Sequence, residues 1–124
     1  MSDNTSTNSA DPLGDLSKAL GRFASERDWD QYHSPKNLTA ALTVEVAELL
    51  EHFQWITEEQ SQNLRAEELA KAREEMADVL LYLLRLASKL DIDLVRAAIE
   101  KIQLNARKYP IDRSRGSSKK YTDI

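Results

Sequence analysis

The chain has 124 residues, a length that fits one domain with a modest hydrophobic core. It contains no cysteine and only two histidines, which excludes disulfides and argues against a zinc site. Its net charge of −4 argues against binding of polymeric nucleic acid, because such proteins normally carry a basic surface. Only 3 glycines and 3 prolines stand against many Ala, Leu, Glu, Lys and Arg residues, which favours an all-α fold.

The two ends of the chain differ in composition from the part between them. Residues 1–11 are polar and lack an apolar segment, so we expect a disordered leader and no signal peptide. Residues 12–110 carry helical periodicity and are expected to form one helical domain, whereas residues 111–124 form a basic tail. The longest apolar run, VLLYLL, is too short to cross a bilayer, so we expect a cytoplasmic protein with no membrane partner.

The first two helices are separated by a proline-containing loop. The first begins near Asp11 and Pro12, an N-cap followed by proline in the first turn, and ends around Arg27. Pro35 keeps the residue before it out of the helical region, so a loop is expected there. The second helix is predicted over about 37–55.

The second half of the domain is predicted to hold two longer helices and one short turn. Thr57 and Gln60 are spaced as a capping box for a short extra helical turn. The third main helix is predicted over about 65–90, and the fourth follows an aspartate cap at position 91 or 93 and ends at Tyr109, before a proline. The sequence therefore predicts a protomer that resembles a four-helix bundle.

Two acidic pairs lie beside the apolar stripes of the second and third helices instead of opposite them. Each pair has the spacing i, i+3, which directs both carboxylates to one side of a helix. If these helices pack antiparallel, four carboxylates meet, and their repulsion calls for a cation between them. Oxygen-only ligands favour Mg²⁺, with Mn²⁺ as a substitute. The predicted ligands are Glu45, Glu48, Glu75 and Asp78.

Two other interpretations of these acids compete with the Mg²⁺ site. Either pair alone is more often a solvated helix face, which is what we expect for Glu67, Glu68 and Glu74. A di-iron bundle would require Glu-x-x-His pairs, and neither helix contains one. The repetition of the pair on two helices favours the Mg²⁺ site.

The fourth helix carries hydrogen-bond donors on one stripe. Lys101, Asn105 and Lys108 recur at i, i+4 and i+7, with Tyr109 adjacent. Such donors suit phosphate oxygens, although a solvated face is the alternative.

Tryptophans occur at two places outside the predicted core. Trp29 lies in a polar loop with His33, and Trp55 ends the second helix. Such rings are either anchors for their own segments or surfaces on which a nucleobase stacks. Together with a Mg²⁺ site and phosphate donors, they suggest a nucleoside polyphosphate as ligand.

The acidic pairs and their flanking blocks resemble a known family. Glu45-V-A-Glu48 and Glu75-M-A-Asp78, separated by 26 residues, resemble the ExxE…ExxD signature of the MazG-like all-α nucleoside triphosphate pyrophosphohydrolases. The blocks ERDWDQYHSPKNL, EHFQW, ADVLLYLLRLA and KIQLNARKYP are similar to the branch of small dCTP pyrophosphatases. The resemblance implies hydrolysis of a (d)NTP to (d)NMP and pyrophosphate.

The resemblance also implies roles for single residues. The four acids would be the Mg²⁺ ligands. For the mechanism we expect water to attack the α-phosphorus, with Glu45 or Glu48 as the catalytic proton acceptor. Leu20 stands where the animal dCTP-specific relatives have a histidine, so the preferred base stays open. The positions that match the substrate pocket are Trp29, His33, Lys36, Asn37, Trp55, Tyr82, Lys101, Asn105, Lys108 and Tyr109.

The sequence thus predicts a housekeeping enzyme that trims deoxynucleoside triphosphates. The alternatives are a non-catalytic helical interaction module and a related phosphohydrolase that releases phosphate. The apolar stripes offer more surface than one small bundle covers, and the family resemblance implies dimers or tetramers. We therefore expect an obligate homo-oligomer, with a tetramer made of two dimers favoured over a dimer.

Overall fold

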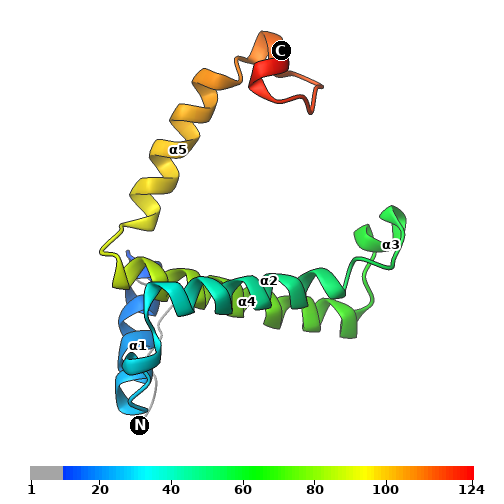
Figure 1. Cartoon of the computed structure of the whole chain (residues 1–124). Coiled ribbons are helices and arrows are strands. Elements are labelled where there is room, and N and C mark those ends of the chain that lie inside the picture. The colour runs from blue at the N-terminus through cyan, green and yellow to red at the C-terminus, as the bar shows by residue number, and fades with distance from the viewer. Residues whose placement is uncertain (1–9) are drawn as a thin grey trace. The chain divides into compact units, whose positions relative to one another are not determined.

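The computed structural model describes residues 10–124, and this part of the chain is all-helical, as predicted (Figure 1). The predicted leader, residues 1–11, lies outside the described residues except for Ala10 and Asp11. No described helix combines the length and the apolar character needed to cross a membrane. The elements are α1 (Pro12–Glu26), η1 (Asp30–Tyr32), α2 (Pro35–Glu51), α3 (Glu58–Gln62), α4 (Ala66–Lys89), α5 (Leu94–Lys108), α6 (Ile111–Ser114) and η2 (Tyr121–Asp123).

The chain divides into two compact units, one ending at Asp91 and the other spanning Ile92–Ile124. In the first unit, α2 lies along α4, and α1 packs against α4 (Figure 1). The side-by-side arrangement of α2 and α4 is the one that brings the two acidic pairs toward each other. The second unit contains α5, α6 and η2.

Side-chain caps set the starts of the first two helices. Asp11 Oδ1 accepts a hydrogen bond from the Gly14 amide at 3.0 Å, and Ser34 Oγ accepts one from the Asn37 amide at 3.1 Å. In both helices proline occupies the first turn, where its missing N–H costs nothing. The predicted start of the second helix at residue 37 was therefore two residues late, because Pro35 belongs to the helix.

The predicted end of the second helix was also wrong. α2 ends at Glu51, and the Phe53 and Gln54 amides both donate to the Leu50 carbonyl at 2.9 Å, which closes a turn. Trp55 consequently lies after the helix, not on it. The apolar periodicity continued through this turn and so concealed the helix end.

The predicted caps of the later helices are confirmed. Thr57 Oγ1 accepts from the Gln60 amide at 3.1 Å while Gln60 Oε1 accepts from the Thr57 amide at 3.0 Å, which completes the capping box of α3. Asp93 caps α5 by accepting from the Arg96 amide at 3.1 Å. Asp91, the other candidate, instead adopts a positive φ of 55° in the turn between α4 and α5.

The basic tail contains two short helices that its lack of periodicity did not predict. In the second unit, the Tyr109 and Tyr121 rings meet edge to face with centroids 6.0 Å apart. The Lys108 ammonium lies 4.9 Å from the centroid of the Tyr121 ring. These contacts hold η2 against the end of α5.

The hydrophobic core of the described chain is small. Its buried apolar residues are Ala24, Leu38, Ala72, Leu84 and Ala87. Large apolar side chains on α5 remain exposed within their own unit: Val95 is 46%, Ile99 52% and Ile102 69% exposed. Single exposed apolar residues are common, but a row along one helix is a surface that another chain can cover.

Candidate active site

Three of the four predicted metal ligands meet between α2 and α4. Glu45, Glu48 and Glu75 each offer one carboxylate oxygen, and these oxygens all lie within 4.8 Å of one another. The i, i+3 spacing turns Glu45 and Glu48 to one side of α2, and α4 runs beside that face. All three side chains are half-buried. We call these three residues the acidic cluster.

Asp78, the fourth predicted ligand, is exposed and is not part of the acidic cluster. Its charge nevertheless acts on the cluster, because it contributes to raising the pKa of Glu45. The structure therefore brings three predicted carboxylates together and leaves the fourth within electrostatic range.

The acidic cluster binds protons more tightly than ordinary carboxylates do. Burial raises the pKa of Glu45 to about 7, followed by the hydrogen bond and charge of Glu48 and by the charges of Asp78 and Glu75. The pKa of Glu75 is also raised, by burial and by Glu48, while His52 acts in the opposite direction. His52 Nε2 lies 3.7 Å from Glu75 Oε1. Within the described chain, His52 therefore offsets only part of the effect that burial and neighbouring carboxylates have on Glu75.

The donor set suits a hard divalent cation. Glu45 Oε2 and Glu75 Oε2 are buried, yet neither has a hydrogen-bond partner among the described residues. A buried carboxylate oxygen without a partner is costly, and a cation would satisfy it while cancelling the repulsion. The ligands are all oxygens, which is the preference of Mg²⁺ and Mn²⁺. Residues 45, 48 and 75 therefore fit the ion that the sequence predicts.

Two predicted pocket residues form part of an aromatic group at the start of α2. The Trp29 ring meets the Phe23 ring at 5.5 Å between centroids, at an interplanar angle of 72°. The His33 ring lies 6.4 Å from Trp29, at 63°. Trp29 remains 43% exposed, so one part of its ring is open to a ligand. Sequence reasoning found Trp29 and His33 but missed Phe23, which resembled an ordinary apolar residue of α1.

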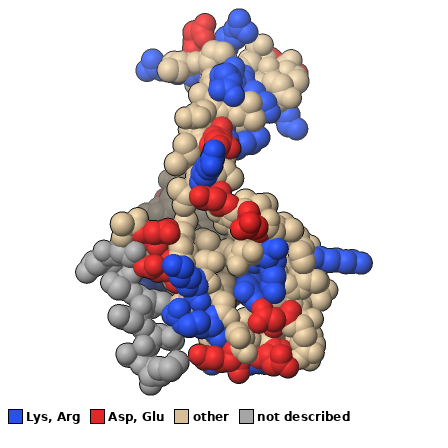
Figure 2. Space-filling view, turned by 90° about the vertical axis from the view of Figure 1, so that its left-hand side faces the viewer, with Lys and Arg blue, Asp and Glu red and all other residues tan. Residues whose placement is uncertain are grey.

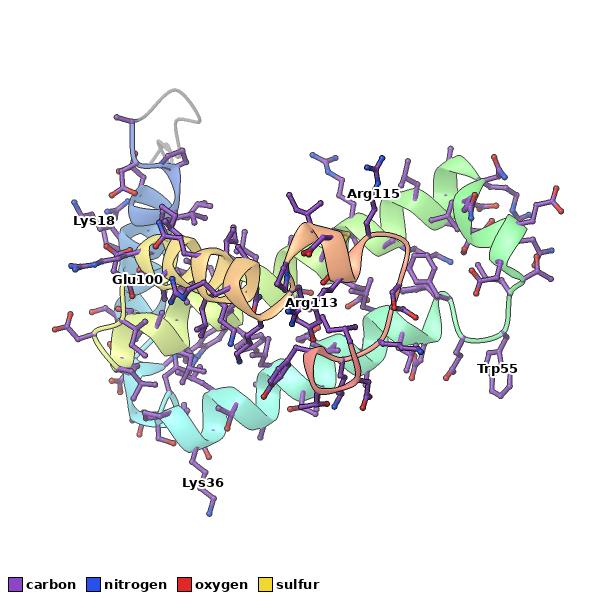
Figure 3. All side chains as sticks on the ribbon, turned by 90° about the horizontal axis from the view of Figure 1, so that it is seen from above. Lys18, Lys36, Trp55, Glu100, Arg113 and Arg115 are labelled. Carbon is purple, nitrogen blue, oxygen red and sulfur yellow. The ribbon has the colours of Figure 1, made fainter. Side chains whose placement is uncertain are left out.

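The other predicted residues at this end of α2 have different surroundings. Asn37 Nδ2 donates to the Tyr32 carbonyl at 3.0 Å, so its amide secures the loop that carries Trp29 and His33. Lys36 is exposed and points away from the helices (Figure 3).

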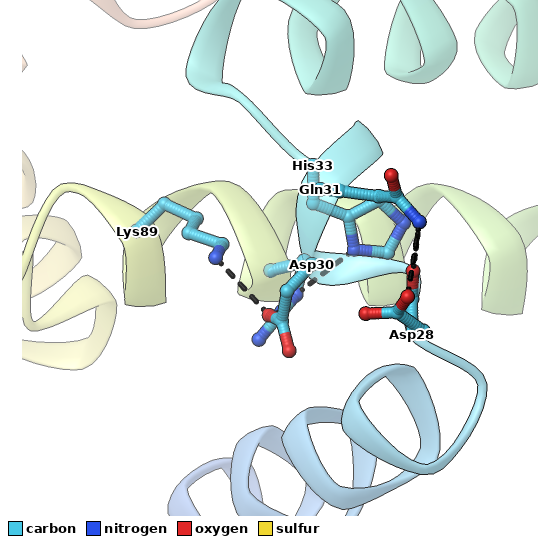
Figure 4. A network of polar contacts seen from close by, with 6 residues as sticks. Asp28, Asp30, Gln31, His33 and Lys89 are labelled. Atoms are coloured by element: carbon cyan, nitrogen blue, oxygen red, sulfur yellow. Dashed lines mark hydrogen bonds and ion pairs between the residues drawn. The ribbon is translucent and has the colours of Figure 1, made fainter.

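A second polar group holds the same loop and was missed by sequence reasoning. The Arg85 guanidinium bonds Asp30 through Nη2 and His33 through Nε, and Lys89 Nζ bonds Asp30 Oδ1 at 3.1 Å (Figure 4). We call Arg85, Asp30, His33 and Lys89 the arginine network. Its only sequence signal is an arginine inside an apolar run, LYLLRLASKL, with a partner more than fifty positions away.

Trp55 and Tyr82 lie away from the Trp29 loop. Trp55 is 86% exposed and lies at the opposite end of α2 from Lys36 (Figure 3). The 17 residues of α2 span about 25 Å at 1.5 Å per residue, so one chain does not bring the two tryptophans together. Tyr82 is half-buried on α4, one turn beyond Asp78.

The second unit carries the predicted phosphate-binding stripe. Lys101 and Asn105 are exposed, Lys108 is half-buried, and Tyr109 is 36% exposed. From Ile92 onward the sequence has eight Lys or Arg residues and four Asp or Glu residues. Figure 2 shows Lys and Arg side chains gathered around this unit, at the top of the view. The four predicted residues thus belong to a unit in which basic residues outnumber acidic ones.

The all-helical fold and the paired carboxylates of α2 and α4 are the features by which the sequence resembled one protein family. Comparison with known proteins supports the same family. The family model described as MazG-like matches residues 40–124, and the chain belongs to the MazG-like family. It is similar to dCTP pyrophosphatase 1 of Rattus norvegicus, with 46% identity over 114 residues that cover 90% of this chain and 67% of the relative. The Homo sapiens protein of the same name is 44% identical over the same shares of both chains.

A solved structure supports the same placement. A pyrophosphatase from Archaeoglobus fulgidus superimposes with a TM-score of 0.75 and 39% sequence identity, covering 79% of this chain and 92% of that chain. Because the match with this solved structure covers most of both chains, the all-helical architecture is that of the MazG-like pyrophosphatases. The family predicted from the sequence is therefore confirmed.

Proposed function

We propose that the chain is a Mg²⁺-dependent nucleoside triphosphate pyrophosphohydrolase that converts a (d)NTP to (d)NMP and pyrophosphate. The enzyme class is supported by the relatives named above. The observation that carries the metal dependence is the acidic cluster, in which buried carboxylate oxygens from α2 and α4 have no hydrogen-bond partner among the described residues. The preferred substrate in this proposal is dCTP or another dNTP, within nucleotide-pool housekeeping.

Glu45, Glu48 and Glu75 would hold the ion, with Asp78 completing the set. When bound, Mg²⁺ would neutralise phosphate charge and make a nearby water more acidic. Water oxygen bonds to the α-phosphorus while the bond from that phosphorus to the bridging oxygen breaks, and the pyrophosphate departs with the bonding electrons. Glu45 or Glu48 accepts the proton that the water loses. A carboxylate whose pKa is near 7 without a cation becomes a weaker base when a cation is near, because opposite charge favours ionisation.

The remaining predicted residues would bind the nucleotide. Trp29, His33 and Asn37 lie in or beside one loop and are assigned to the nucleoside, together with Lys36, Tyr82 and Trp55. Lys101, Asn105, Lys108 and Tyr109 belong to the basic second unit and are assigned to the phosphates. In this proposal, residues 12–110 form the catalytic domain and residues 111–124 a basic tail.

We also propose that the working form is a homo-oligomer, a tetramer in preference to a dimer. The small core and the exposed apolar row on α5 support this assembly. The length of α2, which separates Trp29 from Trp55, supports this assembly as well. Two copies of the chain could supply one pocket with both rings. Light scattering at micromolar concentration tests the proposal, and a fully active monomer would refute it.

The decisive experiment measures pyrophosphate release from a panel of dNTPs, NTPs and modified nucleotides, with Mg²⁺, with Mn²⁺ and with EDTA. The proposal expects release of pyrophosphate and nucleoside monophosphate only when a divalent ion is present. Orthophosphate as the product would indicate the related phosphohydrolase. No turnover of any nucleotide with either ion would favour the non-catalytic interaction module.

A further inference from the structure

Arg85 is a charged residue buried inside the most apolar segment of α4. Its side chain is only 8% exposed, and its sequence neighbours are Leu84 and Leu86. The guanidinium also reaches α1, where a Cβ placed on Gly21 would lie 3.8 Å from Arg85 Nη1. Arginine stays charged at physiological pH, so its burial requires partners in fixed positions.

Those partners come from the loop that carries Trp29. Arg85 Nη2 donates to Asp30 Oδ1, and Arg85 Nε donates to His33 Nδ1 at 3.1 Å. Lys89 adds a second cation to the same Asp30 oxygen at 3.1 Å (Figure 4). One edge of the planar guanidinium, formed by Nε and Nη2, therefore fixes two loop residues at once.

The contact with His33 also decides where its ring proton lies. Arg85 Nε always carries hydrogen, so His33 Nδ1 must accept with its lone pair. A neutral imidazole that accepts at Nδ1 carries its proton at Nε2. No described residue accepts a hydrogen bond from His33 Nε2, which leaves this donor for water or a ligand.

The surroundings of His33 oppose a second proton on its ring. Burial is the largest cause of the lowered pKa of His33, and the Arg85 charge is next. The Asp30 carboxylate acts against them, and Lys89 adds a smaller lowering. With Arg85, Asp30 and Lys89 around it, His33 is neutral at physiological pH.

We propose that Arg85 is a positioning residue that holds His33 as a neutral Nε2–H donor beside the Trp29 ring, ready for a hydrogen-bond acceptor on a bound nucleobase. This inference rests on the proposed function for its ligand. A neutral donor next to an aromatic surface suits a base carbonyl or ring nitrogen. A phosphate would instead favour a protonated imidazole, which the Arg85 charge opposes.

The test uses NMR of ¹⁵N-labelled histidines in the full chain without nucleotide. The chain has only two histidines, so His52, which pairs with Glu75, serves as an internal control. Arg85→Met keeps an unbranched apolar stem but removes both donors. We expect His33 to change from one Nε2–H tautomer to a mixture and its pKa to rise, while His52 stays unchanged. Arg73→Met, at an exposed position of the same helix, should alter neither ring.

Arg85→Lys provides a second variant if the methionine variant does not fold. It retains a cation for Asp30 but replaces the two donors of the guanidinium, Nε and Nη2, with a single ammonium. His33 should therefore again show a mixture of tautomers. A pure Nε2–H tautomer in the folded variants would overturn the proposal. This readout needs no substrate, so a parent protein that hydrolyses no dNTP would refute the proposed function without deciding the role of Arg85.

Kinetics with dCTP then test the positioning role. Loss of one hydrogen bond to the base should raise KM about tenfold in Arg85→Met, with kcat nearly unchanged. In a His33→Ala background, Arg85→Met should have little further effect, because the two residues act through one contact. Fully additive effects of the two substitutions on KM would show that Arg85 acts independently of His33, and would overturn the proposal.

Discussion

The first unit holds two polar clusters that differ in how their charges are paired. In the arginine network, Arg85 and Lys89 both donate to Asp30, and Arg85 also donates to His33. In the acidic cluster, three carboxylates face one another, and buried oxygens of Glu45 and Glu75 have no partner within the described chain. The charges of the arginine network are paired within the described chain, whereas those of the acidic cluster are not.

This difference separates charges that hold the structure from charges that could act on a ligand. A buried charge that is paired within the chain stabilises a particular loop geometry. Like charges that remain close together destabilise the chain and persist where binding depends on them. The comparison predicts opposite consequences for substitutions in the two clusters.

The largest effect is expected for the carboxylates. Glu48→Gln and Asp78→Asn keep side-chain shape but remove a charge that the ion needs, so turnover should fall below detection while the helical fold is retained. Pyrophosphate release and far-UV circular dichroism measure the two properties. Glu74→Gln is the matched control, because Glu74 is exposed on α4 beside the cluster residue Glu75. Parental turnover in either active-site variant would make the metal assignment wrong.

The next effect concerns the aromatic residues assigned to the base. Alanine at Trp29 or Trp55 should cost about 1–3 kcal/mol of affinity for a non-hydrolysable dNTP analogue, the amount typical of base stacking. Tyr32→Ala is the control, because Tyr32 is 61% exposed in the same loop and is not assigned to the ligand. Titration followed by tryptophan fluorescence gives the affinities. Unchanged affinity in both tryptophan variants would return these rings to the role of loop anchors.

Much of the fold followed from local signals. The caps at Asp11, Thr57 and Asp93 each depend on residues three positions apart, so sequence alone contains the whole interaction. The end of α2 did not follow, because the apolar spacing runs on through a turn up to Trp55. These helix starts could be predicted from the sequence because capping contacts join residues close together in the chain. The end of α2 could not be predicted from apolar periodicity alone.

The candidate site likewise has a part that could be predicted from the sequence and a part that could not. The acidic pairs could be predicted because their spacing repeats on two helices that pack together. The arginine network could not, because Arg85 and Asp30 are distant in sequence and neither forms a recognisable motif. The apolar stripes led us to expect an oligomer, but nothing in the sequence indicates which copy would supply Trp55 to the proposed pocket.

A smaller effect should distinguish the clusters by the sign of a stability change. Without divalent ions, Glu45→Gln should raise the melting temperature, because it removes like-charge repulsion and a carboxylate whose pKa is raised by burial. Asp30→Asn should lower it, because buried Arg85 loses its carboxylate partner. Differential scanning fluorimetry in EDTA measures both, and each shift should be a few degrees. Shifts of the same sign would show that the clusters do not differ in this way.

The smallest effect is the pH dependence of the metal-free protein. The folded-state pKa of Glu45 is raised to about 7 from an ordinary value of 4.5, and that of Glu75 is raised as well. Between pH 4.5 and about pH 7, Glu45 therefore binds more protons in the folded chain than in the unfolded chain. The contribution of Glu45 to stability is therefore fully present below pH 4.5 and is lost as the pH rises through about 7.

Asp30 has the opposite dependence. Its pKa is lowered from 3.8, by Lys89 most of all and also by Arg85, so its stabilising effect is present above pH 3.8 and is lost as the pH falls below that value. Only the acidic cluster should therefore make the metal-free melting temperature fall between pH 5 and pH 8. Scanning fluorimetry in EDTA at several pH values should show this decline in the parent and a weaker one in Glu45→Gln. Saturating Mg²⁺ should flatten it too, because a bound cation favours the ionised carboxylates. An equal decline in parent and variant would assign the pH dependence to groups outside the acidic cluster.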